Sequence, residues 1–336
     1  ELWAQARATR DLLAGNTARQ TERMAGDKLI MGTARFTGPN TLDVDGQTMQ
    51  ARAFVIATGS EPVVPGPFAA LGERLITTDH LFDLQQLPKS IGILGVGAIG
   101  LEMGLALSRL GVRVVAGDMK PLPGGISDPE VGARAIARFG QELTMWLDAP
   151  MEATATDDGV ELRSGPHSDR VDLVLAALGR RPLTVQLDLA QAGVPLDERG
   201  HPQIDLQTLR GGDAPVFFAG DVAAIRPLMH EAVDEGILAA RGAAQAVDNR
   251  KLDRAPRSTP IAIVFSDPDI AVVGRSWESL DLEQTVIGSA EGTANGRSRV
   301  LGAEDNLVRI YVERGRGRLL GATVLATRGE HLAHLL

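Results

Sequence analysis

The chain of 336 residues contains no cysteine, and this absence removes several kinds of chemistry at once. Within these residues there can be no disulfide, no thiolate zinc site and no catalytic thiol. Cysteine usage therefore leaves the redox compartment undetermined.

Long apolar runs and an excess of positive charge are also lacking. No stretch of about 18 or more apolar residues occurs, so the sequence predicts no membrane-spanning helix. The net charge of −9 argues against a surface for nucleic acid or for an anionic membrane. Hydrophobic residues, at 44%, are numerous enough for a large buried core in two or three domains.

Two further absences concern the ends of the chain. The sequence begins with ELWAQARATR, without an initiator Met or a signal segment, and its last residues, GEHLAHLL, have a helical pattern. We expect the chain to be part of a longer protein, and we expect that protein to be cytoplasmic.

What the chain does contain is a glycine-rich loop between a predicted strand, SIGILGVG, and a predicted helix, AIGLEMGLALSRLG. Its GxGxxG pattern suits a tight turn, the close approach of a pyrophosphate, and close packing of the helix on the strand. The free N–H groups and positive dipole end of the helix N-terminus attract phosphates. The alternative is an ordinary glycine-rich turn. The predicted nucleotide contacts are Gly95, Val96, Gly97, Ala98, Ile99 and Gly100.

Asp118 ends the next predicted strand, VRVVAGD, at roughly the 20-residue spacing expected of the acid that binds the adenosine ribose. A carboxylate there repels a 2′-phosphate, so the sequence favours NAD over NADP. Arg113 and Lys120 are nearby cations that could soften this preference. The alternative is that Asp118 is a solvated turn residue.

Two strand endings in the chain resemble each other. FVIATGSEP begins at Phe54 and LVLAALGRRP begins at Leu173, and each apolar run stops at a glycine with a proline three residues later. Each ends a predicted antiparallel meander of short strands separated by turn formers, and the last strand of the first meander is QTMQARAFVIAT. Two such units imply two dinucleotide-binding domains, of which only the one between the two endings has its glycine loop.

In this order and spacing, several segments make the chain similar to the pyridine nucleotide–disulfide oxidoreductases, and within that family to the dihydrolipoamide dehydrogenases. The resemblance covers nearly the whole chain and depends on ATGSEPVVPG, LPKSIGILGVGAIGLEMG, ALGRRP, VFFAGDVA, HEAVDEG and FSDPDIAVVG. It implies an α/β fold with two FAD/NAD(P)-binding Rossmann-like domains of three ββα layers and an α+β interface domain that forms a homodimer. The implied parts are residues 1–82 and 185–254 for FAD, 83–184 for NAD, and 255–336 for dimerisation.

The resemblance also implies roles for matching positions. Asp221 would hydrogen-bond the ribityl chain of FAD, and the helix that starts near Leu228 would point its N-terminus at the flavin. Glu102 would lie near the nicotinamide and the flavin; as an acid in the first turns of a helix it is also favourably placed for stability alone. Leu178 and Gly179 would contact NAD. The implied FAD contacts are Thr58, Gly59, Gly220, Asp221, Leu228 and Met229.

Some parts of the family pattern have no counterpart in the chain: the upstream FAD glycine loop, the redox cysteine pair with its following lysine, and the downstream His-Glu pair. We expect the full-length protein to pass electrons between NAD(H), FAD and a dithiol or disulfide substrate, and we expect this chain alone to be inactive and to hold FAD poorly. Alternatives are a catalytically silent nucleotide-binding and dimerising module, a soluble transhydrogenase, a glutathione reductase or a mercuric reductase.

The remaining charged and imidazole side chains invite simpler interpretations. We interpret three arginines as solvated loop charges: Arg180, Arg181 and Arg257, the first residue of the segment RSTP. His331 and His334 lie three residues apart on one helix, but two imidazoles without further ligands make a poor metal site.

Overall fold

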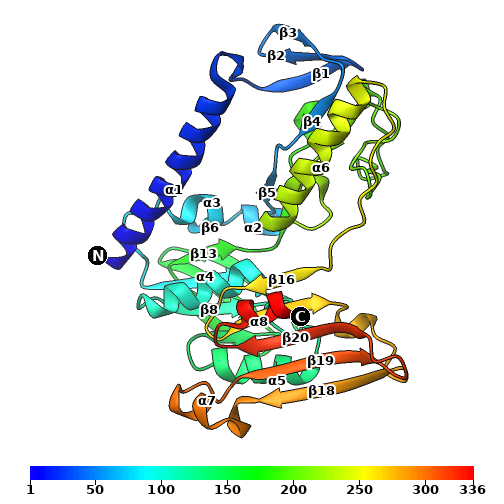
Figure 1. Cartoon of the computed structure of the whole chain (residues 1–336). Helices are drawn as coiled ribbons and strands as arrows, with labels where there is room; N and C mark the ends of the chain where they lie inside the picture. Colours follow the sequence, from blue (N-terminus) through cyan, green and yellow to red (C-terminus); the bar gives the residue numbers. More distant parts are fainter. The chain divides into compact units, whose positions relative to one another are not determined.

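The chain folds into two units, each assembled from segments that are far apart in the sequence (Figure 1). The structure is a computed structural model that describes residues 1–336. Unit 1 comprises residues 1–9, 62–179 and 259–336, and unit 2 comprises residues 10–61 and 180–258. The segment with the glycine loop and the C-terminal segment therefore belong to one unit. The four-part division implied by the resemblance stays a prediction.

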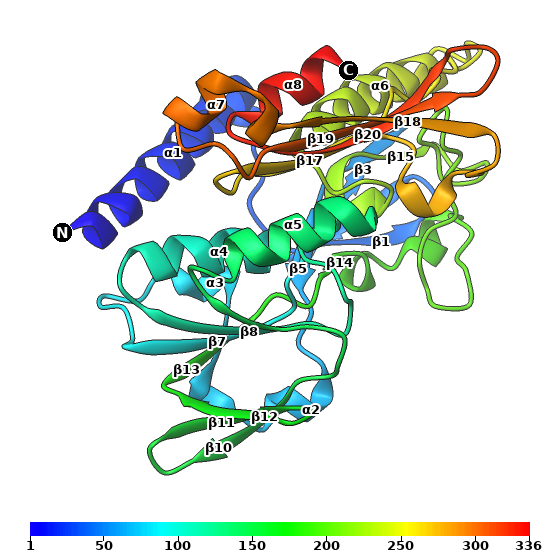
Figure 2. The same ribbon diagram turned by 90° about the horizontal axis from the view of Figure 1, so that it is seen from below.

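A sheet of five parallel strands, in the order β6-β13-β7-β8-β9, carries the glycine loop in unit 1. Helices α4 and α5 lie on one face of this sheet and the antiparallel sheet β10-β11-β12 on the other (Figure 2). These are the predicted three ββα layers. The elements are α2 Gly66–Ala69, β6 Leu75–Thr77, α3 Thr78–Leu81, β7 Ser90–Leu94, α4 Ala98–Arg109, β8 Arg113–Gly117, α5 Pro129–Phe139, β9 Thr144–Trp146, β10 Glu152–Thr156, β11 Gly159–Ser164, β12 His167–Val171 and β13 Leu173–Ala176.

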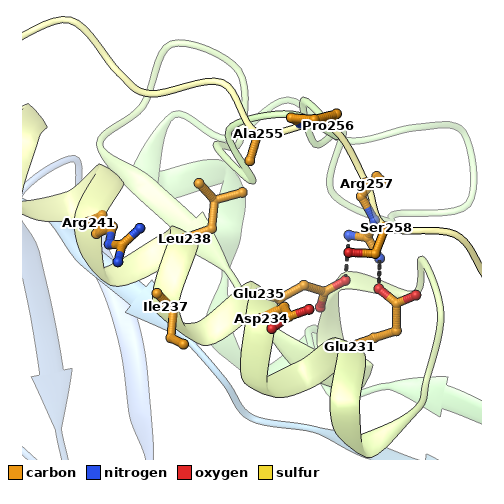
Figure 3. Close-up of a pocket in the computed structure, with 10 residues that line it drawn as sticks. All are labelled: Glu231, Asp234, Glu235, Ile237, Leu238, Arg241, Ala255, Pro256, Arg257 and Ser258. Carbon is orange, nitrogen blue, oxygen red and sulfur yellow. Dashed lines mark hydrogen bonds and ion pairs between the residues drawn. The ribbon is translucent and has the colours of Figure 1, made fainter. Parts of the chain in front are cut away.

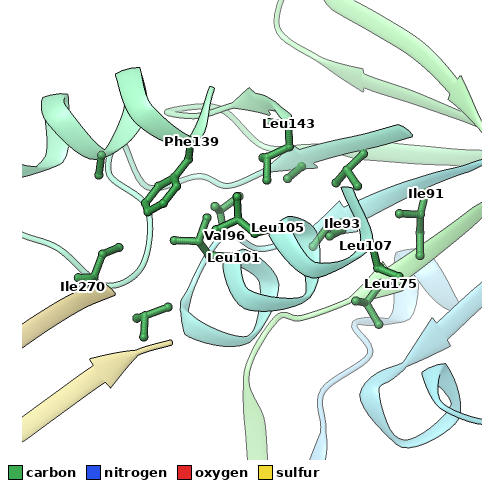
Figure 4. Close-up of a cluster of buried hydrophobic side chains, with 14 of the residues drawn as sticks. Ile91, Ile93, Val96, Leu101, Leu105, Leu107, Phe139, Leu143, Leu175 and Ile270 are labelled. Atoms are coloured by element: carbon green, nitrogen blue, oxygen red, sulfur yellow. The ribbon is translucent and has the colours of Figure 1, made fainter. Parts of the chain in front are cut away.

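The core of unit 1 lies between the parallel sheet and its helices (Figure 4). Ile91 and Ile93 of β7 pack with Leu101 and Leu105 of α4 and with Phe139 of α5, and all five side chains are buried. Burial of an aliphatic or aromatic side chain of this size contributes about 1.5–3 kcal/mol. This packing fixes the start of α4, and with it the glycine loop.

An antiparallel sheet, in the order β16-β17-β20-β19-β18, completes unit 1. Ile270 of β17 joins the core around α4, and Arg109 and Arg138 both donate hydrogen bonds to the carbonyl of Asp267, at 3.1 and 3.3 Å. Strand β18 was not predicted from the sequence. The elements are β16 Ile261–Val264, β17 Asp269–Gly274, β18 Thr285–Glu291, α7 Gly296–Val300, β19 Leu307–Glu313, β20 Leu319–Ala326 and α8 Gly329–Leu335.

Unit 2 is built from short strands and the long helix α6, which packs on β15. Gly242 lets this helix approach the strand, because a Cβ at that position would lie 2.6 Å from the ring of Phe217. Strands β1, β2 and β3 form an antiparallel meander, while β4 pairs in parallel with β15. The elements are β1 Ala34–Gly38, β2 Thr41–Val44, β3 Gln47–Gln50, β4 Phe54–Ile56, β5 Ser60–Pro62, β14 Arg180–Pro182, β15 Val216–Phe218 and α6 Met229–Val247.

Helix α1, Leu2–Ala25, begins in unit 1 and has no buried residue. At its start Trp3 stacks on Phe82, with ring centroids 5.5 Å apart, and its indole nitrogen donates a hydrogen bond of 2.8 Å to the carbonyl of Leu84. Seven short 3-10 turns complete the chain: Gly26–Lys28, Gly72–Arg74, Val185–Leu187, Leu189–Ala192, Gly220–Ala223, Trp277–Ser279 and Gly292–Ala294.

The two similar strand endings do adopt similar structures. Each follows a three-stranded antiparallel meander, and its strand, β4 or β13, then pairs in parallel. One prediction was wrong in detail: QTMQARAFVIAT is not one strand but two, β3 and β4, which belong to different sheets. No helix is both long enough and apolar enough to span a bilayer.

Candidate functional site

The glycine loop has the backbone that its sequence predicts. Gly95 follows β7 with φ +92°, and its N–H donates a hydrogen bond of 2.8 Å to the carbonyl of Gly117. A Cβ at Gly100 would lie 1.9 Å from the carbonyl oxygen of Gly95, so only glycine allows α4 to pack this closely on the loop. A Cβ at Gly97 would meet nothing within 4 Å, so the space beside it is open. The loop therefore offers an uncovered backbone at Gly97, the start of a 12-residue helix.

Gly97 is the N-cap of α4 and makes no side-chain cap. The N–H groups of Ala98, Ile99 and Gly100 lie in the first turn, where a helix has no backbone acceptors of its own. Unsatisfied N–H groups and the positive end of the helix dipole together make a site suited to a phosphate. This arrangement fits the pyrophosphate of a dinucleotide.

The carboxylate of Asp118 lies directly beside the loop. It accepts hydrogen bonds from the N–H groups of Val96, at 2.7 Å, and of Lys120, at 2.9 Å. Both bonds hold the carboxylate at the carboxyl end of the parallel strands, where open α/β sheets bind their ligands. The side chain is thus fixed by the fold and is not a freely solvated turn residue.

Arg113 and Lys120 are the two cations that could soften the preference for NAD, but Arg113 already contacts other residues. Its guanidinium pairs with Asp169 at 2.6 Å and also donates to the carbonyl of Arg170. Lys120 is exposed. The expectation for Arg113 was therefore wrong, because its charge is compensated by the neighbouring strand β12.

Leu178 and Gly179, which follow β13, lie in the same unit as the loop. The Leu178 side chain would be 3.5 Å from a Cβ at Gly95, so it borders the loop, and 36% of it is exposed. Gly179 has φ +98°, and its carbonyl accepts a hydrogen bond of 3.0 Å from Val63. The exposed leucine remains available to a ligand at the strand ends.

Glu102 has a structural partner that the sequence did not indicate. Its Oε1 accepts a hydrogen bond of 2.9 Å from the backbone N–H of Phe265, which follows β16. The carboxylate therefore ties α4 to the C-terminal antiparallel sheet within unit 1. Its proximity to a nicotinamide stays a prediction.

A second group of polar residues lies in unit 2, around Asp221. The hydroxyl of Ser60 donates a hydrogen bond of 2.6 Å to Asp221 Oδ2. Arg180 donates to the same hydroxyl oxygen, at 2.7 Å, and to the Ser60 carbonyl, also at 2.7 Å, and its Nε lies 3.8 Å from the Asp221 carboxylate. The interpretation of Arg180 as a solvated loop charge was therefore wrong.

Asp221 follows Gly220, whose φ of +76° turns the chain sharply after β15. The N–H of Gly220 donates a hydrogen bond of 2.8 Å to Glu235 of α6, and Glu235 in turn accepts one of 2.7 Å from Arg257. Arg257 also pairs with Glu231 at 2.7 Å (Figure 3). Arg257 is thus an internal ion-pair partner, and its interpretation as a solvated loop charge was wrong.

The carboxylate of Glu231 is 5% exposed, and burial opposes its ionisation. Arg226, at 2.9 Å, and Arg257 more than offset this penalty and hold the pKa of Glu231 below its usual range. The sequence offered one signal for this cluster, the two glutamates four residues apart on one face of a helix. It offered none for the two arginines that neutralise them.

Beside Thr58 lies a pocket of unit 2 with a volume of about 600 Å³. The Thr58 hydroxyl donates a hydrogen bond of 2.8 Å to the carbonyl of Leu183, and Gly59, with φ +73°, accepts one from the Leu183 N–H. The sequence analysis missed most of the wall: Gly32, Thr33, Ala34, Glu61 and the residues 181–187. The volume suits a nucleoside-sized group, since ligand pockets span about 300–1,000 Å³.

Two further predicted positions open α6. Leu228 is the N-cap of this 19-residue helix and Met229, its first residue, is 86% exposed. The helix N-terminus is therefore accessible. No group of three or more metal-ligating side chains occurs in the structure, and His331 lies 3.3 Å from Glu330.

Comparison with known proteins identifies the family. The family model described as pyridine nucleotide-disulphide oxidoreductase matches residues 4–236, and the model of the dimerisation domain of the same family matches residues 260–336. Dihydrolipoyl dehydrogenase of Thermus scotoductus is 33% identical over 91% of this chain and 67% of its own length. Dihydrolipoyl dehydrogenase of Manduca sexta is 30% identical over 91% of this chain and 64% of its own length. The chain thus spans about two thirds of the length of these relatives.

Solved structures support the same fold. The HOCl-induced flavoprotein disulfide reductase RclA from Escherichia coli superimposes with a TM-score of 0.85 at 23% identity, covering 98% of this chain and 78% of that protein. At this identity the likeness concerns the fold alone. The predicted α/β fold with Rossmann-like domains and a dimerisation domain is confirmed.

Proposed function

Because the chain belongs to the pyridine nucleotide-disulphide oxidoreductase family, we propose that its protein is a flavin-dependent oxidoreductase that exchanges electrons between NAD(H) and a dithiol or disulfide. The family and its dihydrolipoyl dehydrogenase members use FAD and NAD(H). The observation that carries the proposal is the glycine loop with Asp118 bonded to it at 2.7 Å, because this pair fits a dinucleotide on its own physical grounds.

The residues of unit 1 would hold NAD(H). The first-turn N–H groups of α4 would bind the pyrophosphate, and Gly97 leaves the space that it needs. Asp118 would accept hydrogen bonds from the ribose hydroxyls and would repel a 2′-phosphate. We infer a preference for NAD(H) over NADP(H).

The residues of unit 2 would hold FAD. Asp221, fixed by Ser60, would hydrogen-bond the ribityl chain, and the pocket beside Thr58 would receive the adenosine. The accessible N-terminus of α6 at Leu228 and Met229 would stabilise negative charge on the flavin. When bound, FAD supplies the two-electron carrier between the nicotinamide and a disulfide.

The dithiol substrate is proposed from the relatives. The dihydrolipoyl dehydrogenases of Thermus scotoductus and Manduca sexta match at 33% and 30% identity over about nine tenths of this chain, which favours a dihydrolipoyl group. A steady-state assay of the full-length protein would test this. We expect NAD+-dependent oxidation of dihydrolipoamide to exceed the reaction with glutathione or with mercuric ion by at least tenfold. NAD(H)-NADP(H) exchange without any thiol reaction would instead support a transhydrogenase.

A second candidate is a nucleotide-binding and dimerising module without catalysis. The absence of cysteine from these residues favours it for this chain. The same assay separates the two, since a silent module would bind NAD(H) in a calorimetric titration but would oxidise no dithiol. Cell fractionation of the full-length protein would test the predicted cytoplasmic location.

We further propose a homodimer formed through residues 255–336. The match of the dimerisation-domain model to residues 260–336 supports it. Obligate interfaces bury about 2,000 Å² or more and are mostly apolar. Light scattering over a dilution series should report twice the mass of the chain, and a monomer at all concentrations would contradict the assignment.

A further inference from the structure

The geometry points to Glu235 as a positioning residue for the flavin side of the site. Glu235 holds the Gly220–Asp221 turn through a hydrogen bond from the Gly220 amide, and Arg257 in turn holds Glu235. The inference rests on the proposed function, because the turn matters through Asp221 and its contact with FAD. It assigns a role to the ion pair between Glu235 and Arg257, which takes no part in the reaction with a dithiol.

Glu235 is engaged at both carboxylate oxygens. Its Oε2 accepts the N–H of Gly220 at 2.8 Å, and its Oε1 accepts an N–H of Arg257 at 2.7 Å. The residue is 3% exposed, so water does not compete for these bonds. A charged acceptor makes a stronger and shorter bond to a backbone N–H than a neutral one does.

The Gly220 amide needs this acceptor because the strand ladder ends one residue earlier. The N–H of Ala219 still donates to the carbonyl of Ile56 of β4, at 3.0 Å. At Gly220 the backbone turns away with φ +76°, and its N–H points to α6 instead. Without Glu235 the half-buried amide of Gly220 would lose its hydrogen-bond acceptor, and the turn would lose the contact that fixes the direction of Asp221.

Arg257 makes this arrangement possible by neutralising two buried carboxylates at once. Its two terminal nitrogens donate to Glu235 and to Glu231, one helical turn away, each at 2.7 Å (Figure 3). Glu231 has a second cation in Arg226, whereas Arg257 is the cation that contacts Glu235. Removal of Arg257 would therefore affect Glu235 more than Glu231.

Apart from Arg257, whose ion pairs reach α6, the segment 255–258 is separated from α6 by a pocket of about 220 Å³. Arg241 lies in the wall of the same pocket but at a distance from the ion pairs (Figure 3). Asp234 is the neighbour of Glu235 on α6, and its side chain is exposed. These two residues supply controls of the same charge at the same site.

The test compares FAD affinity in variants of the full-length protein. Glu235→Leu removes a charged acceptor and should raise the Kd for FAD by about 10- to 100-fold. Glu235→Gln keeps an acceptor oxygen for the Gly220 amide and should raise it by less than about tenfold. As a single substitution, Arg257→Leu should also weaken FAD binding. In the Glu235→Gln background it should raise the Kd for FAD little further. Asp234→Leu and Arg241→Leu should leave the Kd within about twofold.

A second readout does not need FAD. Amide hydrogen exchange of Gly220, measured by NMR without the flavin, should be at least about tenfold faster in Glu235→Leu, which removes the acceptor, than in the two controls. Circular dichroism would verify that each variant is folded. Unchanged FAD affinity and unchanged Gly220 exchange in the folded Glu235 variants would overturn the inference. If the unmodified protein bound no FAD, the proposed function would fail, and the exchange rates would still decide whether Glu235 holds the turn.

Discussion

The hydroxyl of Tyr311 in β19 donates a hydrogen bond of 2.7 Å to the carboxylate of Asp128, the N-cap of α5. Both residues are fully buried, and the Asp128 carboxylate also accepts the N–H groups of Glu130 and Val131 in the first turn of the helix. One carboxylate therefore both caps α5 and joins it to the C-terminal sheet. Burial is the main cause that raises the pKa of Tyr311 well above its usual range, so the phenol remains a donor.

Tyr311→Phe should lower the free energy of unfolding by about 1–3 kcal/mol, because Asp128 would lose a donor that water cannot replace. The Thr323 hydroxyl lies 2.8 Å from that of Tyr311 and would lose its partner as well. Urea unfolding followed by tryptophan fluorescence would measure the change. In a double-mutant cycle, Thr323→Val should cost less in the Tyr311→Phe background than in the unmodified protein. Strict additivity would show that the two hydroxyls do not act together.

Features encoded by a few adjacent residues were predictable from the sequence. The spacing of Gly95, Gly97 and Gly100 is a local requirement of one turn, and the bond between Asp118 and Val96 follows from the geometry of two neighbouring parallel strands. The loop and the place of Asp118 at the end of the next strand could be stated before the fold was known, whereas the hydrogen bond between Asp118 and Val96 was not predicted.

Partners set by tertiary contacts were not predictable. Arg180 contacts a residue 120 positions away, Arg257 contacts residues 22 and 26 positions away, and nothing in their local sequence distinguishes them from solvated charges. Strand β18 was missed because its residues are mostly exposed and include Gly288, so it shows no clear apolar alternation. The split of QTMQARAFVIAT into two strands is decided by β15, which lies about 160 residues later and pairs with β4 but not with β3.

Asp118→Asn should reduce the preference for NAD(H) over NADP(H) by about tenfold. The amide keeps an oxygen for the N–H of Val96, so the loop should remain intact, but the negative charge that repels a 2′-phosphate is removed. Calorimetric titration with both nucleotides would measure the ratio. Glu152→Gln, which removes an exposed charge of β10 in the same unit, serves as the control and should leave the ratio unchanged. Equal binding of NADP(H) by the unmodified protein would contradict the assignment of Asp118.

A pair of acids, of which Asp269 is buried and Glu330 is partly exposed, should make the stability of unit 1 depend on pH. Burial, and then the carboxyl group of Glu330 in α8, raise the pKa of Asp269 in β17 to about 7, whereas the hydrogen bond from protonated Asp269 lowers the pKa of Glu330. The folded state therefore holds a proton that the unfolded chain releases near pH 4. The contribution of Asp269 to stability is complete below that pH and is lost as the pH rises through about 7.

Asp269→Asn mimics the protonated acid and should remove this dependence. Between pH 5 and 8 the Tm of the unmodified protein should fall relative to that of Asp269→Asn, and the difference should be largest at the alkaline end. Asp267→Asn, at an exposed position two residues earlier, is the matched control and should follow the unmodified protein. Parallel Tm curves for all three proteins would show that Asp269 does not titrate in this range.

Two glycines of the loop should respond to alanine in opposite ways, because one is limited by the protein and the other by its ligand. A Cβ at Gly100 would lie 1.9 Å from the carbonyl of Gly95, so Gly100→Ala must displace α4 and should cost about 1–3 kcal/mol of stability, as overpacking does. Gly97 has φ −69° and open space around it, so Gly97→Ala should leave the Tm nearly unchanged. It should nevertheless weaken NAD(H) binding by at least about tenfold, because its methyl group would occupy the position where a pyrophosphate approaches the backbone.

Differential scanning calorimetry and nucleotide titration separate the two effects. The control for alanine itself is Gly236→Ala in α6, where a Cβ also meets nothing within 4 Å. Unchanged NAD(H) affinity in a stable Gly97→Ala variant would mean that the phosphates do not bind at this loop.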